Sequence, residues 1–184
     1  MMHPAFLYVP GERLSQTELS AARIDGHVVD VGDAYIPADL VEGPDVRAST
    51  IAALVRPGTA ACHQTAAWVH GAGDTPPVVH HVKRCVDRRI RPVTSARVVF
   101  HDTLLPAADV LTLSGVAVSS PARTMLDLAT TLHRDPRVLA WMDLLAVVCP
   151  DTPDAAMNAL QDLRRVPGSR MGSAALQRLA VRRR

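Results

Sequence analysis

The chain has 184 residues and a formal net charge of +2, with 48% hydrophobic and 21% charged residues, which is the balance of a globular protein with one core or two small ones. Three widely spaced cysteines argue against a disulfide framework and favour a reducing cytoplasm. The sequence shows no secretory signal and no run of about 18 apolar residues, so we expect a cytoplasmic protein without a membrane partner.

Charge is distributed unevenly along the sequence. Residues 1–45 carry eight acids and two bases, whereas residues 46–100 carry eight bases and two acids. This asymmetry predicts an acidic surface and a basic surface, which could also complement each other within the molecule.

The first predicted elements are a helix and a β-hairpin. Ser15 and Glu18 have the spacing of a capping box, which predicts a helix over residues 14–22. Residues 27–31 and 34–37 flank Gly32 and Asp33, and Pro37 closes the second run, which predicts a β-hairpin with a tight turn. A helix followed by a hairpin is typical of the end of a winged helix-turn-helix.

The middle of the chain mixes helices and strands. We predict helices over residues 46–55 and 59–70, the second because it is rich in alanine and is followed by Gly71. We also predict that His70 caps the end of that helix. Strands are predicted over short valine-rich runs at residues 78–82, 97–101, 110–113 and 116–118.

The last third of the chain is predicted to be helical. Ser120 is a favourable N-cap and Pro121 suits the first helical position, so a helix should begin there. Arg123 and Asp127 are four residues apart and are expected to form a structural ion pair. The predicted helices cover residues 121–132, 137–148, 153–164 and 172–182.

These elements predict an α+β fold. An abridged, acidic, winged-helix-like N-terminus over residues 1–45 should be followed by a mixed domain over residues 46–184. That domain should contain a small antiparallel sheet and a helical C-terminal half.

Several motifs occur in a recognisable order: the pair Arg47-Ala48, the run Gln64-Thr-Ala-Ala-Trp-Val-His-Gly71, a Pro-Pro loop, and the run Ser119-Ser-Pro-Ala-Arg-Thr-Met-Leu-Asp-Leu-Ala129. Over about residues 14–175 the chain resembles the actinobacterial AbiEi-like antitoxins, which are type IV toxin–antitoxin transcriptional regulators. The resemblance implies a winged-helix domain that binds operator DNA, an α+β domain that contributes to antitoxin function, and a nucleotidyltransferase-like toxin as partner. It also leads us to expect no nuclease-like domain after the last helix.

The N-terminal region departs from a full helix-turn-helix. The predicted hairpin begins about five residues after the first helix ends, so a recognition helix is short or missing. The region is also acidic, whereas a DNA-reading surface is normally basic. Arg23 and His27 are its only candidate DNA contacts.

The strongest candidate nucleic-acid site lies in the basic middle of the chain. Basic side chains spaced along a strand, a loop and a second strand can follow a phosphate backbone. Without Asn or Gln nearby they would supply affinity rather than sequence reading. The alternative is a solvated charged hairpin. The residues are Lys83, Arg84, Arg88, Arg89, Arg91 and Arg97.

The sequence does not favour an enzyme, a cofactor or a metal. It lacks a Gly-x-Ser-x-Gly motif, a phosphate-binding glycine loop and the paired ligand spacing of common zinc sites. The histidines of the middle region are instead expected to be structural, with His80 and His81 on opposite sides of a strand.

Two functions fit the sequence. The first is a DNA-binding regulator of the AbiEi antitoxin type, which represses its own operon through arginine contacts with double-stranded DNA. The alternative is a protein-interaction module that has lost sequence-specific DNA reading and binds a toxin or a second copy of itself as a homodimer.

Overall fold

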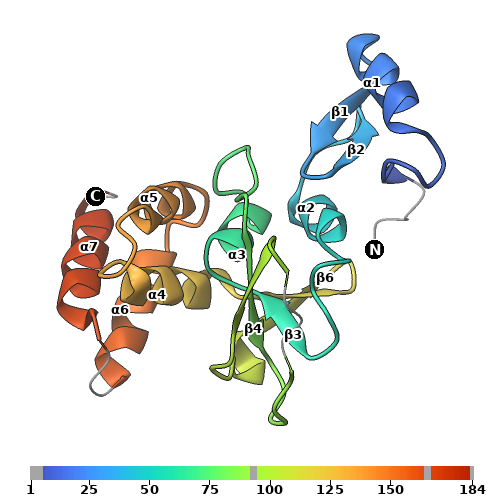
Figure 1. Cartoon of the computed structure of the whole chain (residues 1–184). Coiled ribbons are helices and arrows are strands. Elements are labelled where there is room, and N and C mark those ends of the chain that lie inside the picture. Colours follow the sequence, from blue (N-terminus) through green and yellow to red (C-terminus); the bar gives the residue numbers. More distant parts are fainter. Residues whose placement is uncertain (1–5, 92–94, 164–166, 183–184) are drawn as a thin grey trace.

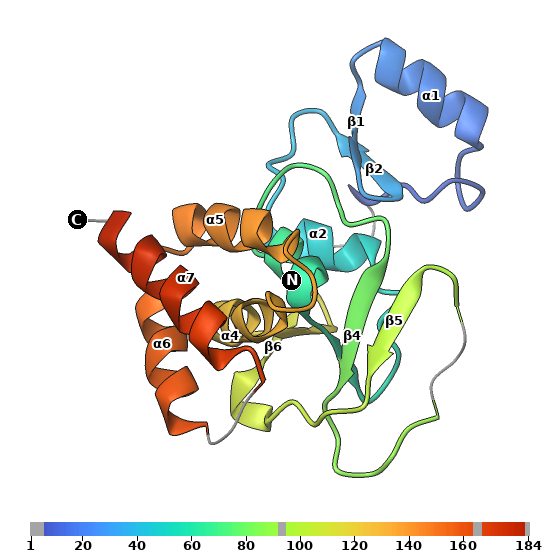
Figure 2. The same ribbon diagram turned by 60° about the vertical axis from the view of Figure 1, so that its left-hand side comes forward.

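The computed structural model describes residues 6–91, 95–163 and 167–182 (Figures 1 and 2). Its first elements are α1 (Gln16–Ile24) and the antiparallel pair β1 (Val28–Val31) and β2 (Ala34–Pro37). Ser15 caps α1, and its backbone N–H donates to the Glu18 carboxylate at 2.7 Å, which is the predicted capping box. This N-terminal unit therefore has the predicted helix and hairpin, and no second helix occurs among its described residues.

The chain enters the larger part of the molecule through α2 (Pro44–Thr50), β3 (Thr59–Ala61) and α3 (His63–Val69). The predicted helix over residues 59–70 is wrong at its start, because the first three residues pair as a strand. The alanine-rich run carries no periodicity that separates a short buried strand from a helix. At the other end of α3, His70 is the C-cap residue, as predicted.

Five strands form one mixed sheet with the order β5-β4-β3-β7-β6. The short β3 is the central strand; it runs antiparallel to β4 and parallel to β7. β4 and β5 are parallel, and β6 and β7 form an antiparallel hairpin. The bounds of the remaining strands are β4 (His80–Arg84), β5 (Val98–His101), β6 (Val110–Leu113) and β7 (Val116–Ser119).

The C-terminal half is helical, as predicted. α4 (Pro121–Thr131) starts at the capped Ser120 and packs against α3 and all three later helices. The later helices are α5 (Val138–Val148), α6 (Thr152–Asp162) and α7 (Ser169–Arg182). Figure 2 shows α5, α6 and α7 grouped around α4, on the side of the molecule opposite the outer strand β5.

Two main cores stabilise these layers. One lies among the C-terminal helices and is centred on α4, with Met125 and Leu128 fully buried. The other joins the hairpin of the N-terminal unit to α2, α3 and the sheet, and it includes Val31, Ile36 and Trp68. The hairpin is therefore packed onto the larger domain, although α1 projects away from it (Figure 1).

The fold class is the predicted α+β arrangement, with a two-stranded sheet, a larger mixed sheet and a helical C-terminal half. Among the described helices, none combines the length and the apolar character needed to cross a bilayer.

Candidate functional site

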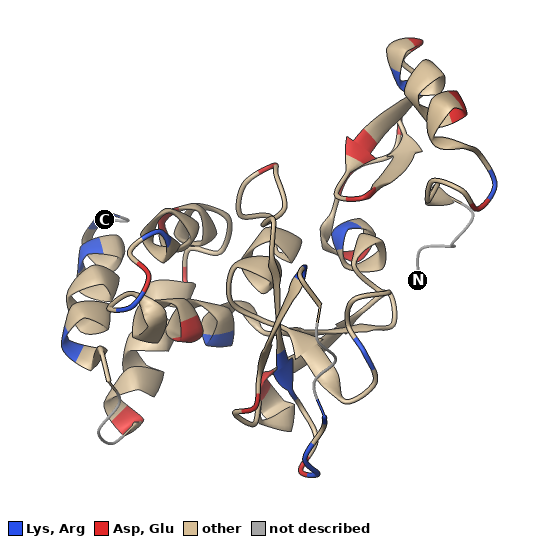
Figure 3. Ribbon diagram, viewed as in Figure 1, with Lys and Arg blue, Asp and Glu red and all other residues tan. Residues whose placement is uncertain are grey.

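The chain between β4 and β5 carries the largest concentration of exposed arginines in the middle of the molecule. We call residues 84–91 the arginine loop. Arg88, Arg89 and Arg91 are exposed, and within the described part of the chain none of the three forms an ion pair or a side-chain hydrogen bond. In Figure 3 the loop projects at the bottom of the view, whereas acidic residues mark the N-terminal unit at the top. Three unpaired guanidinium groups remain able to bind an anion.

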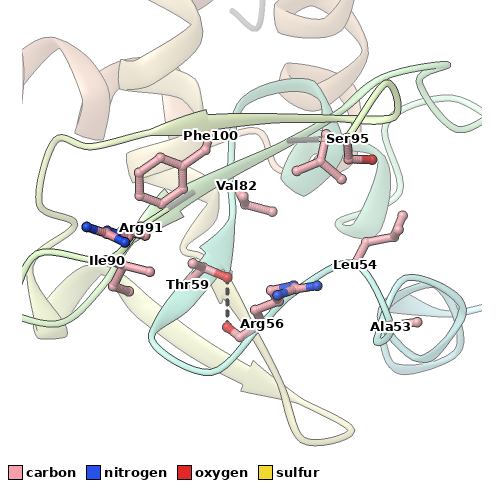
Figure 4. Close-up of a pocket in the computed structure, with 10 residues that line it drawn as sticks. Ala53, Leu54, Arg56, Thr59, Val82, Ile90, Arg91, Ser95 and Phe100 are labelled. Carbon is pink, nitrogen blue, oxygen red and sulfur yellow. Dashed lines mark hydrogen bonds between the residues drawn. The ribbon is translucent and has the colours of Figure 1, made fainter. Parts of the chain in front are cut away.

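A pocket of about 120 Å³ lies beside the arginine loop. Ile90, Val82 and Phe100 provide much of its apolar lining, and Arg56 and Arg91 approach it from different segments (Figure 4). Arg56 precedes β3, and its carbonyl accepts a hydrogen bond of 2.7 Å from the Thr59 hydroxyl. Arg56 is distant in sequence from residues 90–91, and only the fold brings it close to them, so it was not among the predicted site residues.

Two of the predicted DNA contacts are engaged within the protein. Arg84 donates to Asp102 at 3.1 Å and to the carbonyls of Val86 and Asp87, so it shapes the start of the arginine loop. Arg97 pairs with Asp33 of the β1–β2 turn. This second pair realises the expected complementarity between the acidic N-terminal unit and the basic middle region.

Lys83 is buried, which argues against its predicted contact with DNA. Its side chain is only 5% exposed, and its ammonium group binds the Asp127 carboxylate at 2.5 Å. Alternation along β4 turns the Lys83 side chain toward α4. The sequence alone shows only one basic residue beside another, Arg84. A phosphate group cannot reach Lys83 without breaking a buried ion pair.

Arg23 and His27 remain exposed on the N-terminal unit, as a DNA contact requires. Arg23 lies 3.3 Å from Asp30 in an exposed ion pair. Pairs of this kind contribute little to stability, so Arg23 can exchange its partner at low cost.

Asp127 is the centre of a buried ion cluster. Besides Lys83, it accepts a hydrogen bond of 3.1 Å from Arg123, which also lies 3.1 Å from Asp109. The predicted pair of Arg123 and Asp127 is thus present as part of a larger network. Burial alone would raise the pKa of the Asp127 carboxyl, but the adjacent Lys83 ammonium and Arg123 guanidinium hold that pKa below its ordinary value.

The ion cluster borders a cleft of about 550 Å³ between the end of β5 and α4. The cleft is lined by Lys83, Arg123 and Asp127 together with Thr130 and Thr131. The buried ion pair of Lys83 and Asp127 at its wall distinguishes it from the pocket beside the arginine loop.

Residues 59–180 match the model of the AbiEi antitoxin C-terminal domain. The chain belongs to the AbiEi antitoxin family. Within this AbiEi domain lie the arginine loop, the ion cluster and the sheet that connects them, whereas Arg23 and His27 lie outside it.

Among solved structures, the AbiEi chain is similar to the RV2827C protein from Mycobacterium tuberculosis. The identity is 17% and the TM-score is 0.44, with 94% of this chain and 71% of that chain covered. No curated protein matches the sequence.

Arg47, which the sequence marks only as part of the Arg47-Ala48 pair, contacts the AbiEi domain from outside its bounds. Arg47 is buried and donates to the carbonyls of Trp68 and Gly73 at 2.7 and 2.8 Å. It also pairs with Glu42, and its guanidinium lies 5.3 Å from the centre of the Trp68 ring. Arg47 thus holds the end of α3, which lies inside the AbiEi domain, from a helix outside it.

Proposed function

We propose that this protein is a non-enzymatic antitoxin-type regulator that binds double-stranded DNA through the arginine loop and represses its own operon. The observation that carries the proposal is the set of three exposed guanidinium groups of Arg88, Arg89 and Arg91 on one short loop, which have no ion-pair partner among the residues that the structure describes. Membership of the AbiEi antitoxin family supports the antitoxin part of the proposal. A nucleotidyltransferase-like toxin is the partner that the resemblance implies.

The loop geometry suits the phosphate backbone more than the bases. Arginine binds phosphate oxygens with its planar fork of donors, and three such contacts would hold one side of a duplex. Arg56 lies on the other side of the adjacent pocket and would extend the basic surface. No Asn or Gln lies in residues 84–91, so sequence selectivity would have to come from another part of the molecule, for which Arg23 and His27 are the candidates.

The test is a mobility-shift titration of the full chain against the DNA upstream of its own gene, at several salt concentrations. The wild type should show a steep loss of affinity with salt. Replacing Arg88, Arg89 and Arg91 by Glu should abolish the shift at moderate salt. Replacing the same residues by Gln should reduce the slope of log affinity against log salt by about 2.7, because each phosphate contact contributes about 0.9.

A matched control keeps the change in net charge but moves it elsewhere. Arg170, Arg178 and Arg182 are exposed on α7, far along the chain from the arginine loop. Their replacement by Glu should leave most of the DNA affinity intact. Equal losses in both variants would show that only total charge matters, and no shift for the wild type would contradict DNA binding.

The second candidate function is protein binding without DNA binding. Two features of the N-terminal unit favour it. Asp25 and Asp39 are exposed there, which gives an acidic surface. Among the described residues α1 is the helix that precedes the hairpin, whereas a helix-turn-helix needs two or three helices. In that case the wild type would not shift DNA. It would instead bind a basic toxin or form a homodimer, and reversing the charges of Asp25 and Asp39 would weaken that association.

A further inference from the structure

A second group of reactive side chains lies beside the ion cluster and takes no part in the proposed DNA contacts. The Cys62 thiol and the imidazoles of His63 and His101 converge, so that one ligand atom from each lies within 4.8 Å of the others. Cys62 Sγ and His63 Nδ1 are 3.1 Å apart. Around a tetrahedral zinc ion such atoms are separated by about 3.3–3.7 Å, given Zn–S and Zn–N bonds of about 2.3 and 2.0 Å.

We propose that Cys62, His63 and His101 bind a zinc-type transition-metal ion. A thiolate sulfur and two imidazole nitrogens suit zinc and its neighbours in the periodic table, whereas magnesium and calcium require oxygen ligands. Three protein ligands leave a fourth position for water or for a group from a partner. The spacing of 62, 63 and 101 in the sequence does not match a common zinc motif, so only the fold reveals the site.

The fold builds this site at a strained junction. Cys62 follows β3, and His63 begins α3 with a φ of +50°. This left-handed conformation is unfavourable for a residue with a β-carbon, and such strain is common at functional sites. It turns the chain between strand and helix and leaves the His63 ring stacked on that of His101, with 4.4 Å between the ring centres.

His81 is placed to orient a metal ligand. It lies on the neighbouring strand, and its Nδ1 is 3.0 Å from Nε2 of His101. The two rings are stacked with centres 5.3 Å apart. Metal-binding histidines usually have such a hydrogen-bonded partner, which fixes the ring and its tautomer.

Metal binding changes the protonation of the cluster at one group. A neutral imidazole can bind a metal without losing a proton, whereas the Cys62 thiol would release its proton to solvent on binding. The nearby Lys83 ammonium would oppose a cation, but its ion pair with Asp127 offsets that charge.

An ion can also reach the site. His63 and His101 both line the cleft of about 550 Å³ that borders the ion cluster. The thiol of Cys62 is fully buried behind them. The cleft therefore offers a path by which an ion could approach the two imidazoles.

The experiment is a titration of the reduced, chelator-treated full chain with Co²⁺, followed by displacement with Zn²⁺. One equivalent of Co²⁺ should give the near-ultraviolet charge-transfer absorption of a cobalt–thiolate bond, and Zn²⁺ should remove it. C62S should abolish this absorption, and H101Q should weaken Co²⁺ binding at least tenfold. H81Q should weaken it by about 10-fold or more without changing the stoichiometry.

The controls use residues of the same type outside the cluster. C85S and H133Q should behave as the wild type, since neither residue belongs to the converging set. A second measurement needs no variant: Zn²⁺ should shift the imidazole nitrogen signals of His63 and His101 in NMR spectra and leave that of exposed His27 unchanged. Absence of the cobalt absorption in the wild type, or its persistence in C62S, would overturn the proposal.

Discussion

Asp127 is a single buried carboxylate that holds two cations from different parts of the chain. Lys83 comes from β4 and Arg123 from α4, so the carboxylate fixes the distance between the sheet and the central helix. The Coulomb attraction in such a pair is largely offset by the cost of removing charges from water. The ion cluster therefore contributes mainly by fixing the position of α4 relative to the sheet, and less by adding stability.

Removing Asp127 should be much more harmful than removing Lys83. D127A leaves the Lys83 ammonium buried without a partner, and we expect the free energy of unfolding to fall by about 3–5 kcal/mol. K83M leaves the carboxylate bound to Arg123 and should cost clearly less. Urea denaturation at pH 7 measures both values. Equal losses in the two variants would contradict this account of the cluster.

His70 should make stability depend on pH. Its Nε2 lies 2.7 Å from the Ser119 carbonyl oxygen, so the neutral ring donates this bond, and burial lowers the pKa of the ring. The unfolded chain therefore binds a proton below about pH 6.5 that the folded chain resists. Stability should fall as the pH drops from 7 to 5, with a smaller slope in H70Q. The difference between the slopes cannot exceed about 1.4 kcal/mol per pH unit.

Urea denaturation at intervals between pH 5 and 7 provides the check, with H133Q as the control. His133 is exposed, and its substitution should leave the pH dependence of stability unchanged. An H70Q slope equal to that of the wild type would show that other groups cause the dependence.

At the scale of elements, α4 is the scaffold of the C-terminal half, and its start is among the features best predicted from the sequence. Ser120 accepts a hydrogen bond from the backbone N–H of Arg123, and Pro121 occupies the first turn, as the sequence indicated. Local capping chemistry needs no knowledge of the rest of the fold, which is why this helix could be placed within one residue.

The start of α7 was predicted less well, because a glycine lies inside this helix. The sequence suggested that the helix begins at Gly172, but it begins at Ser169 and contains Gly172 in its interior. A β-carbon at residue 172 would lie 2.7 Å from the Ala129 carbonyl oxygen of α4. The glycine therefore allows the close approach of two helices, which no local pattern reveals.

Gly172→Ala should destabilise the protein, although alanine is the better helix former. Propensity alone predicts a gain of about 1 kcal/mol, whereas the clash with the backbone of α4 should cost about 2–3 kcal/mol, which exceeds that gain. Thermal unfolding of G172A should therefore show a lower midpoint than the wild type. Ser173→Ala is the control on the same helix and should change the midpoint little; a raised midpoint in G172A would refute the close packing.

The sites were harder to predict than the helices. In the sequence, Lys83 resembles the other basic residues of its charged segment. Only the pairing of β4 with its neighbouring strands turns the Lys83 side chain toward Asp127 of α4. Cys62, His63 and His101 come from positions up to 39 residues apart and meet because β5 lies parallel to β4. Contacts that depend on strand order cannot be obtained from spacing along the sequence.

At the scale of the whole molecule, the N-terminal hairpin and the AbiEi domain share one core. Ile36 is fully buried in the same cluster as Val46, Val118 and Trp68. The division of the chain at residue 45 stays a prediction, but the packing indicates that the two parts unfold together. The ion pair of Asp33 and Arg97 adds a second link between them.

Ile36→Ala tests this coupling. Loss of a buried isoleucine should lower the free energy of unfolding by about 2–5 kcal/mol. In a Trp141→Phe background, tryptophan fluorescence reports on Trp68, whose ring lies beside Gly32 of the hairpin. Far-ultraviolet circular dichroism reports largely on the C-terminal helices, so the two signals should shift together along the urea axis. Ile24, which is 81% exposed on α1, is the control, and I24A should have little effect. Separate transitions for the two signals in I36A would show independent units.

The place of β3 in the sheet has a consequence for biosynthesis. This three-residue strand is the centre of the sheet, yet Ala61 pairs with Val118, which the ribosome adds 57 residues later. Until β7 has left the exit tunnel, one edge of β3 has no partner, and the side chains that α4 will cover stay in water. We therefore expect nascent chains that end before residue 119 to need protection by chaperones, and the domain to acquire its structure only late in translation.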